Sequence, residues 1–167
     1  MYKNKEFEYH YCMNNYNLIK NIILTFGLVL LVAGLGTLFT QLGMPWFDSL
    51  LKPTEWIPDY VIPIVWTVIY ICIAVVLFLW TQNEGVPGQV VVLFVINGLL
   101  NILWCLIFFT FNSLFLGMVF ILLNLVFAIY LLMSVEKYRP IYARAILIYP
   151  VWLLIATSLN IAVWILN

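Results

Sequence analysis

The residues best suited to chemistry in this sequence are three tryptophans, Trp66, Trp104 and Trp152, which lie inside long apolar runs. At 1.5 Å per residue, they lie roughly 8, 10 and 21 Å below the outer ends of their predicted helices. An indole N–H at such depth needs a hydrogen-bond partner, so these side chains should face the protein interior and offer flat stacking surfaces. The other four tryptophans lie in a loop or at the ends of the runs, where membrane interfaces usually collect this residue: Trp46, Trp56, Trp80 and Trp164.

Polar and aromatic residues recur at helical spacing around each of the three tryptophans. The resulting stripes are Asn97-Asn101-Trp104-Phe108, Pro63-Trp66-Tyr70 and Tyr149-Trp152-Ala156-Asn160. Residues at these spacings share one face of a helix. Three such faces could line a cavity for a flat, largely apolar ligand with a few polar groups. The alternative is that they form the core of a helix bundle, where neutral polar side chains make interhelical hydrogen bonds.

Ionisable and metal-ligating residues are almost absent from the apolar runs. Ion pumps and proton-coupled transporters usually need charged groups inside the membrane, and here only Lys20 lies in a run, near enough to its end to reach the interface. His10 is alone, and the three cysteines form no metal-binding or disulfide pattern, so we expect no metal site. The chain also has no phosphate-binding glycine loop and no basic patch for nucleic acid.

The overall composition requires a membrane protein. Hydrophobic residues make up 66% of the chain and charged residues 8%, whereas globular proteins average about half and a quarter. A helix needs about 20 apolar residues to cross the hydrocarbon layer, and helices satisfy their own backbone groups there. We therefore predict an all-α bundle of five transmembrane helices, at residues 18–42, 61–80, 90–111, 114–133 and 145–166, after a polar, disordered tail at residues 1–17. The breaks lie at Gly43-Met44-Pro45, residues 84–88, Asn112-Ser113 and residues 136–140.

Basic residues predict the orientation of this bundle. Six of them lie on the side of the N-terminus, and only Lys52 lies on the other. The positive-inside rule then places the N-terminus in the cytoplasm and the long first loop outside. No cleavable signal is evident, because the first apolar run is too long for one. These features favour a bacterial cytoplasmic membrane, with an organelle membrane as the alternative.

Ordered motifs along most of the chain resemble the translocator protein family, also called the tryptophan-rich sensory proteins. The first run ends in Gly34-Leu35-Gly36-Thr37-Leu38-Phe39-Thr40, and the next loop reads Trp46-Phe47-Asp48-Ser49-Leu50-Leu51-Lys52-Pro53. The later matches are Pro58, Val65-Trp66-Thr67, Tyr70, Asn101-Ile102-Leu103-Trp104, Ile107-Phe108-Phe109, Pro140, Ala143-Arg144, Tyr149, Trp152, Leu159-Asn160 and Trp164.

This resemblance implies a five-helix bundle, commonly a homodimer, that binds porphyrins such as protoporphyrin IX and in some members haem or sterols. The pocket would lie beneath the first loop, and no further cofactor is required. We expect Trp66, Trp104 and Trp152 to supply stacking surfaces, with Tyr70 beside them, and Asn101 and Asn160 to supply hydrogen bonds. Trp46, Lys52 and Pro53 would form a lid. Lys52 would either pair with a propionate or be an ordinary interfacial lysine.

Three functions fit these expectations. The leading one is a membrane protein that binds a tetrapyrrole (porphyrin or haem) and acts as a sensor, carrier or scavenger, that is, in a receptor or transport role. The second is a light- and oxygen-dependent porphyrin-degrading enzyme, because some bacterial family members are reported to photo-oxidise protoporphyrin through tryptophans that match Trp66 and Trp152. The third is a structural helix-assembly protein, for which substitutions in the pocket would alter stability alone.

Several positions depart from the family pattern. Phe120 stands where helix four usually carries Asp, Cys105-Leu106 follows Trp104 where a proline is typical, and Ile148 replaces a proline that reappears as Pro150. The loop tryptophan is displaced by one, with Glu55 in its place and Trp56 following. The C-terminal cholesterol motif of animal members is absent, because Ile161 and Ile165 replace its Tyr and basic residue. A weak version of that pattern, Val135…Tyr138…Arg144, leaves sterol-like lipids as a further ligand class.

The segment Met1–Cys12 matches nothing in the family, and Met13 begins a compact polar lead into the first apolar run. A tail of this composition buries too little apolar surface to offset an ordering cost of roughly 1–2 kcal/mol per residue. We therefore expect the segment to be dispensable. The alternative is that its aromatic residues form an interfacial segment.

Overall fold

The computed structural model describes residues 2–53, 57–58 and 60–167, with the backbone alone described for residues 2–16. Its elements are α1 (Tyr2–Asp48), α2 (Val61–Asn83), α3 (Gly88–Cys105), the π-helix η1 (Leu106–Thr110), α4 (Leu114–Tyr138), α5 (Pro140–Ile146) and α6 (Ile148–Leu166). Five stretches are long and apolar enough to cross a membrane: Asn17–Asp48, Val61–Asn83, Gly88–Thr110, Leu114–Tyr138 and Pro140–Leu166. The predicted all-α, five-span membrane fold is confirmed.

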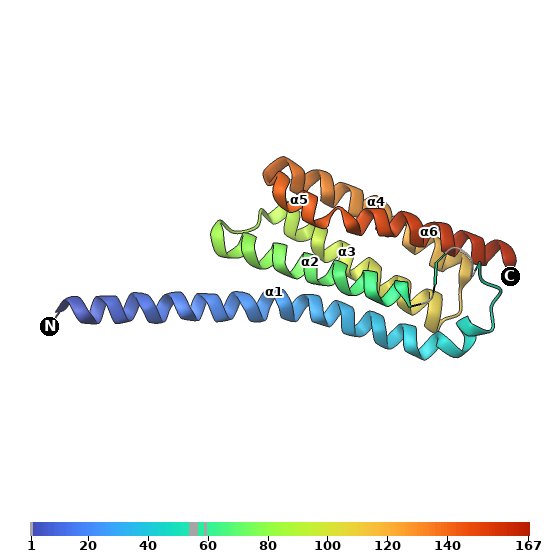
Figure 1. The fold of residues 1–167 in the computed structure, drawn as a ribbon, viewed down its shortest axis with the longest axis horizontal. Helices are drawn as coiled ribbons and strands as arrows, with labels where there is room; N and C mark the ends of the chain where they lie inside the picture. Colours follow the sequence, from blue (N-terminus) through green and yellow to red (C-terminus); the bar gives the residue numbers. More distant parts are fainter. Residues whose placement is uncertain (1, 54–56, 59) are drawn as a thin grey trace.

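The spans form a bundle in which α1 and α4 lie on opposite sides. Along the described residues α1 packs against α2, α3 and η1, whereas α4 packs against α3, η1, α5 and α6. The short Asn112-Ser113 turn makes α3 and α4 antiparallel neighbours, as predicted, and Asn112 adopts a positive φ of 55° there. Figure 1 shows the N-terminal part of α1 extending well beyond the end of the bundle. The helix therefore runs through residues 2–17, for which the sequence predicts a disordered tail.

Helix α1 also corrects the predicted break at Gly43-Met44-Pro45, because it continues to Asp48 with Pro45 inside it. A proline in a helix removes one backbone hydrogen bond. Here the last turn is held by packing, because Met44, Trp46 and Phe47 contact the bundle core.

The fifth span is interrupted where the sequence predicts one continuous helix. Helices α5 and α6 meet at Leu147, three residues before Pro150. Pro150 has no N–H, and its ring conflicts with the carbonyl group of Ile146, four residues earlier. The displaced proline therefore accounts for the break.

The third span changes from α- to π-helical geometry directly after Cys105. The Phe111 N–H donates to the carbonyl oxygen of Leu106, five residues earlier, at 2.9 Å. Single π-turns of this kind occur mostly inside α-helices and often at functional sites. The turn leaves the adjacent rings of Phe108 and Phe109 both buried.

Two clusters of buried side chains form the core. The first lies between η1, α4 and α6 and includes Phe108, Ile121 and Leu153. The second lies toward the opposite end and includes Trp80, which is 2% exposed and packs on Tyr142 with a ring-centroid distance of 5.3 Å. The prediction that Trp80 is an interfacial residue is therefore wrong, because the α5 segment covers it. Trp164 is 43% exposed, as expected for an interface, and Trp56 lies outside the described residues.

Candidate functional site

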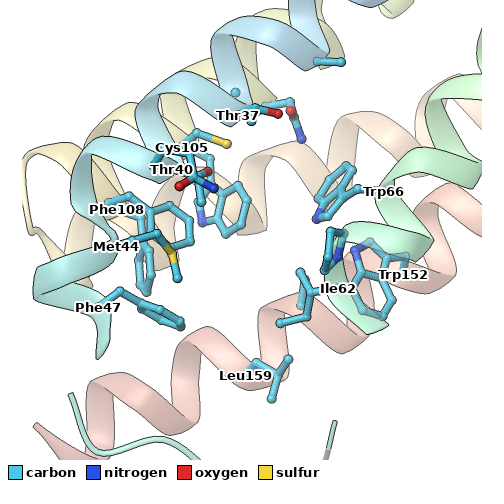
Figure 2. Close-up of a pocket in the computed structure, with 18 of the residues that line it drawn as sticks. Thr37, Thr40, Met44, Phe47, Ile62, Trp66, Cys105, Phe108, Trp152 and Leu159 are labelled. Atoms are coloured by element: carbon cyan, nitrogen blue, oxygen red, sulfur yellow. The ribbon is translucent and has the colours of Figure 1, made fainter. Parts of the chain in front are cut away.

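A cavity of about 530 Å³ lies between α1, α2, α3, η1 and α6. This volume falls within the roughly 300–1,000 Å³ typical of small-molecule sites. Figure 2 shows Ile62, Trp66 and Trp152 on one side of the cavity, facing Met44, Phe47 and Phe108 on the other. The lining is mostly apolar and aromatic, with hydroxyl and amide groups on α1, α2, α3 and α6.

The helices bring together most of the residues expected to bind a ligand. The following predicted residues line the cavity: Lys52, Trp66, Tyr70, Asn101, Trp104, Trp152 and Asn160. Trp46 and Pro53 do not line it. Trp46 lies one layer outside, where its ring contacts that of Phe108 at 5.9 Å between centroids. Phe120, which replaces the family's aspartate, packs against the core and does not reach the cavity.

Near-parallel aromatic rings from three elements form one continuous wall. Trp66 stacks on Tyr70 at 5.7 Å and 26°, and on Trp104 at 6.3 Å and 29°. Trp104 in turn stacks on Phe108 at 6.0 Å and 25°. Such offset arrangements are favourable beyond the area that they bury. The rings of this wall therefore hold one another in position: Trp104 and Phe108 are 7% and 2% exposed, and Trp66 is the partly exposed member.

Hydrogen bonds orient this wall from behind. The Trp104 indole N–H donates to Asn160 Oδ1 at 3.2 Å, and Asn160 Nδ2 donates to the carbonyl oxygen of Ala156 at 3.0 Å. Both polar atoms of Asn160 therefore already have partners, and the residue positions Trp104. On the neighbouring helices the Tyr70 hydroxyl donates to Asn101 Oδ1 at 2.9 Å.

Two buried donors on the cavity lining have no partner among the described residues. These are Asn101 Nδ2 and Trp152 Nε1, on side chains that are 3% and 5% exposed. Buried polar groups in folded proteins nearly always have partners, so unpaired ones need an explanation. Both atoms are enclosed, so a bound molecule could supply their acceptor only after a side chain has turned.

The contribution of α1 was missed from the sequence. Four of its nine lining residues follow one another at helical spacing: Gly36, Thr40, Met44 and Phe47. The helical spacing that identified the other three stripes also connects these residues. The stripe was missed because it contains neither Trp nor Asn, the residue types around which the other stripes were sought. At Gly36 an added Cβ would lie 3.4 Å from Cys105 Sγ and 3.6 Å from Asn101 Oδ1, so the glycine leaves room beside these side chains.

Helix α1 and η1 approach until their backbones touch. A Cβ at Gly43 would overlap the backbone carbonyl group of Phe109. The Thr110 hydroxyl also donates to the carbonyl oxygen of Phe39 at 2.9 Å. This close contact places Phe108 and Phe109 against the aromatic face of α1, where Phe47 packs on both rings.

The cavity opens sideways between α1 and α2. Six of its lining residues on these two helices are exposed, although they lie at membrane depth: Leu30, Thr37, Gln41, Pro63, Thr67 and Ile71. The Thr67 hydroxyl satisfies its hydrogen bond within its own helix, donating to the carbonyl oxygen of Pro63 at 2.7 Å.

The first loop meets the last helix at the mouth of the cavity. The backbone N–H of Leu51 donates to Asn167 Oδ1 at 3.1 Å, and Asn167 Nδ2 donates to the carbonyl oxygen of Leu51 at 3.0 Å. These two bonds fix the loop directly beside Lys52, whose ammonium group lies 3.2 Å from Asp48 Oδ1.

Comparison with known proteins agrees with this architecture. Residues 25–165 match the model of the TspO/MBR family. The chain is 31% identical over 155 residues to the tryptophan-rich protein TspO of Chlorobaculum tepidum, covering 89% of this chain and 97% of the relative. It is 29% identical over 157 residues to the TspO of Archaeoglobus fulgidus (93% and 99% covered) and 35% identical over 130 residues to protein CrtK of Rhodobacter capsulatus (73% and 78% covered). With a family match over most of its length and these relatives, the chain belongs to the TspO/MBR family.

Proposed function

We propose that this multi-pass membrane protein binds a tetrapyrrole, either a porphyrin or haem, as a sensor, carrier or scavenger. The observation that carries the proposal is the wall of near-parallel rings formed by Trp66, Trp104 and Phe108 in a cavity of about 530 Å³. A flat macrocycle is a ligand shape that can stack on the partly exposed Trp66 ring of this wall. The cytoplasmic position of the N-terminus, a bacterial cytoplasmic membrane and a homodimeric assembly are parts of the same proposal.

The polar groups of the cavity suit the rest of such a ligand. Asn101 Nδ2 and Trp152 Nε1 are buried donors without partners among the described residues, and Lys52 is a cation at the mouth. Carboxylates are acceptors, so the propionate groups of a porphyrin offer partners at the edge of the molecule. Sterol-like lipids are a weaker candidate, because a flat aromatic wall offers a saturated ring no π-stacking.

Titration of the detergent-solubilised protein with protoporphyrin IX tests the proposal. We expect a shift of the Soret band and quenching of tryptophan fluorescence at micromolar ligand. Replacing Trp66 by Leu removes one stacking surface, worth about 1.4 kcal/mol at the upper end for an aromatic pair, and should weaken binding roughly tenfold.

The matched control is Trp164→Leu, which removes an indole that packs on Phe115 outside the cavity. This variant should bind as tightly as the wild type. Absence of any spectral change in the wild-type titration, or equal losses in the two variants, would exclude the aromatic wall as a porphyrin site.

A second candidate function is light- and oxygen-dependent degradation of the bound porphyrin. It is favoured by the presence of two oxidisable indoles, Trp66 and Trp152, on the lining of one cavity. Illumination of the complex in air should then bleach the Soret band in the wild type and much more slowly in the Trp66→Phe, Trp152→Phe double variant. Equal bleaching in both proteins would remove these tryptophans from the reaction.

A purely structural role predicts a different pattern. Substitutions in the cavity would then change the free energy of unfolding alone, because the wild-type protein would bind no porphyrin. Measuring unfolding and porphyrin binding on the same Trp66→Leu sample therefore separates a binding protein from a helix-assembly protein.

A further inference from the structure

The cavity carries one pair of opposite charges, at its mouth. Among the described residues that line it, Asp48 and Lys52 are the only charged ones. Asp48 ends α1, Lys52 follows four residues later, and Lys52 Nζ lies 3.2 Å from Asp48 Oδ1.

The two partners of this pair are held very differently. The Lys52 side chain is 17% exposed, and its ammonium group lies 4.5 Å from the centroid of the Phe47 ring. Phe47 is itself fixed against Phe108 and Phe109, at centroid distances of 5.9 and 5.2 Å. Asp48 by contrast is 61% exposed. The cation therefore belongs to the cavity wall, whereas the carboxylate lies on its outer side.

An exposed carboxylate of this kind is easily exchanged for another. Ion pairs with a well-solvated partner are typically worth about 0.2–1 kcal/mol. Lys52 has three donor hydrogens, and Asp48 is the only side-chain hydrogen-bond partner that the described residues offer it.

We infer that Asp48 is an internal counter-ion whose place a carboxylate of the ligand takes, so that Asp48 sets the preference of the cavity between acidic and neutral ligands. The inference rests on the proposed function and names Asp48 as a residue that weakens the binding of ligands with a carboxylate. While Asp48 is present, the mouth has no net charge and the incoming carboxylate must displace a like charge. Removing that charge leaves Lys52 free to pair with the ligand.

The test compares protoporphyrin IX with its dimethyl ester, which has the same ring and no carboxylate. Asp48→Asn should raise the affinity for the acid by roughly two- to fivefold at low salt, and leave the affinity for the ester unchanged. The gain should shrink as salt screens the remaining charge. Lys52→Gln should lower the affinity for the acid and leave that for the ester unchanged.

Glu84→Gln is the matched control. It also removes one acid from an ion pair at the surface, with Arg139, but Glu84 does not line the cavity. We expect no change with either ligand. An effect of this variant equal to that of Asp48→Asn would show that overall charge is responsible, and would overturn the inference.

The remaining outcomes also decide the matter. If Asp48→Asn weakens binding of the acid, Asp48 holds Lys52 in position and the counter-ion role is wrong. Equal responses of acid and ester would likewise overturn the inference while leaving the proposed function in place. If neither ligand binds to the wild-type protein, the proposed function and the inference fall together.

Discussion

Two glycines of α1 allow the close packing of this helix to be measured with one chemical change. At Gly27 an added Cβ would meet no atom within 4 Å, whereas at Gly43 it would overlap the backbone carbonyl group of Phe109. Both residues lie within α1, so replacing either by Ala makes the same change in side chain and removes the same backbone freedom. The two variants therefore differ mainly in the space around the new methyl group.

The expected difference between them is large. Alanine is favoured over glycine inside a helix by about 0.8–1 kcal/mol, so Gly27→Ala should be neutral or stabilising by up to that amount. Overpacking costs typically about 1–3 kcal/mol, and more where the obstacle cannot rotate away. At Gly43 the obstacle is backbone, so α1 and η1 must separate, which also strains the bond from the Thr110 hydroxyl to Phe39. We expect Gly43→Ala to lower the free energy of unfolding by about 3 kcal/mol.

Unfolding in mixed micelles, followed by far-ultraviolet circular dichroism as the fraction of denaturing detergent rises, measures both variants against the wild type. Porphyrin binding should fall in Gly43→Ala and persist in Gly27→Ala, because the displaced element carries Phe108 and Phe109. If the free energies of unfolding of Gly43→Ala and Gly27→Ala lie within about 0.5 kcal/mol of each other, the backbone contact between α1 and η1 is not what holds this side of the cavity.

Three further outcomes are expected. Asn160→Leu leaves the Trp104 N–H buried without its partner and should destabilise the protein by about 1–2 kcal/mol, whereas Ser158→Ala, on the exposed face, should stay within about 0.5 kcal/mol in the same unfolding assay. Asn167→Ala removes both bonds to Leu51 and should speed hydrogen exchange of the Leu51 amide roughly tenfold, with an unchanged Leu51 rate counting against the loop contact. Deletion of residues 2–12 should leave folding and porphyrin binding intact, and a large drop in either would show that the segment belongs to the fold.

Much of the architecture was predictable because lipid permits few alternatives. Apolar runs of about 20 residues must be helices there, and the charges between them mark the turns. Trp66, Trp104 and Trp152 were identified as interior residues by depth alone, and all three line the cavity. Their positions follow from local periodicity, which is a property of one helix at a time.

Features that depend on two helices at once were not predictable. The packing of the last turn of α1 against the core outweighs the lost hydrogen bond at Pro45, and the burial of Trp80 depends on where α5 lies. The sequence predicts that Asn160 supplies a hydrogen bond to the ligand, whereas in the structure it accepts one from Trp104. This contact was not predictable because Trp104 lies 56 positions earlier in the chain. The π-turn of η1 is not predictable from the residues of its own span either. It packs against the backbone at Gly43, which belongs to a different span.

The sideways opening between α1 and α2 changes what an affinity means for this protein. An apolar molecule that reaches the cavity past Thr37 and Thr67 arrives from the hydrocarbon phase, where it is far more concentrated than in water. Occupancy then follows the mole fraction of the ligand in the membrane or micelle, and diluting the same ligand into more lipid lowers occupancy at a constant total concentration. A dissociation constant measured for this cavity therefore compares ligand in the cavity with ligand dissolved in the surrounding lipid or detergent. Such constants can be compared between experiments only when the amount of lipid or detergent is stated.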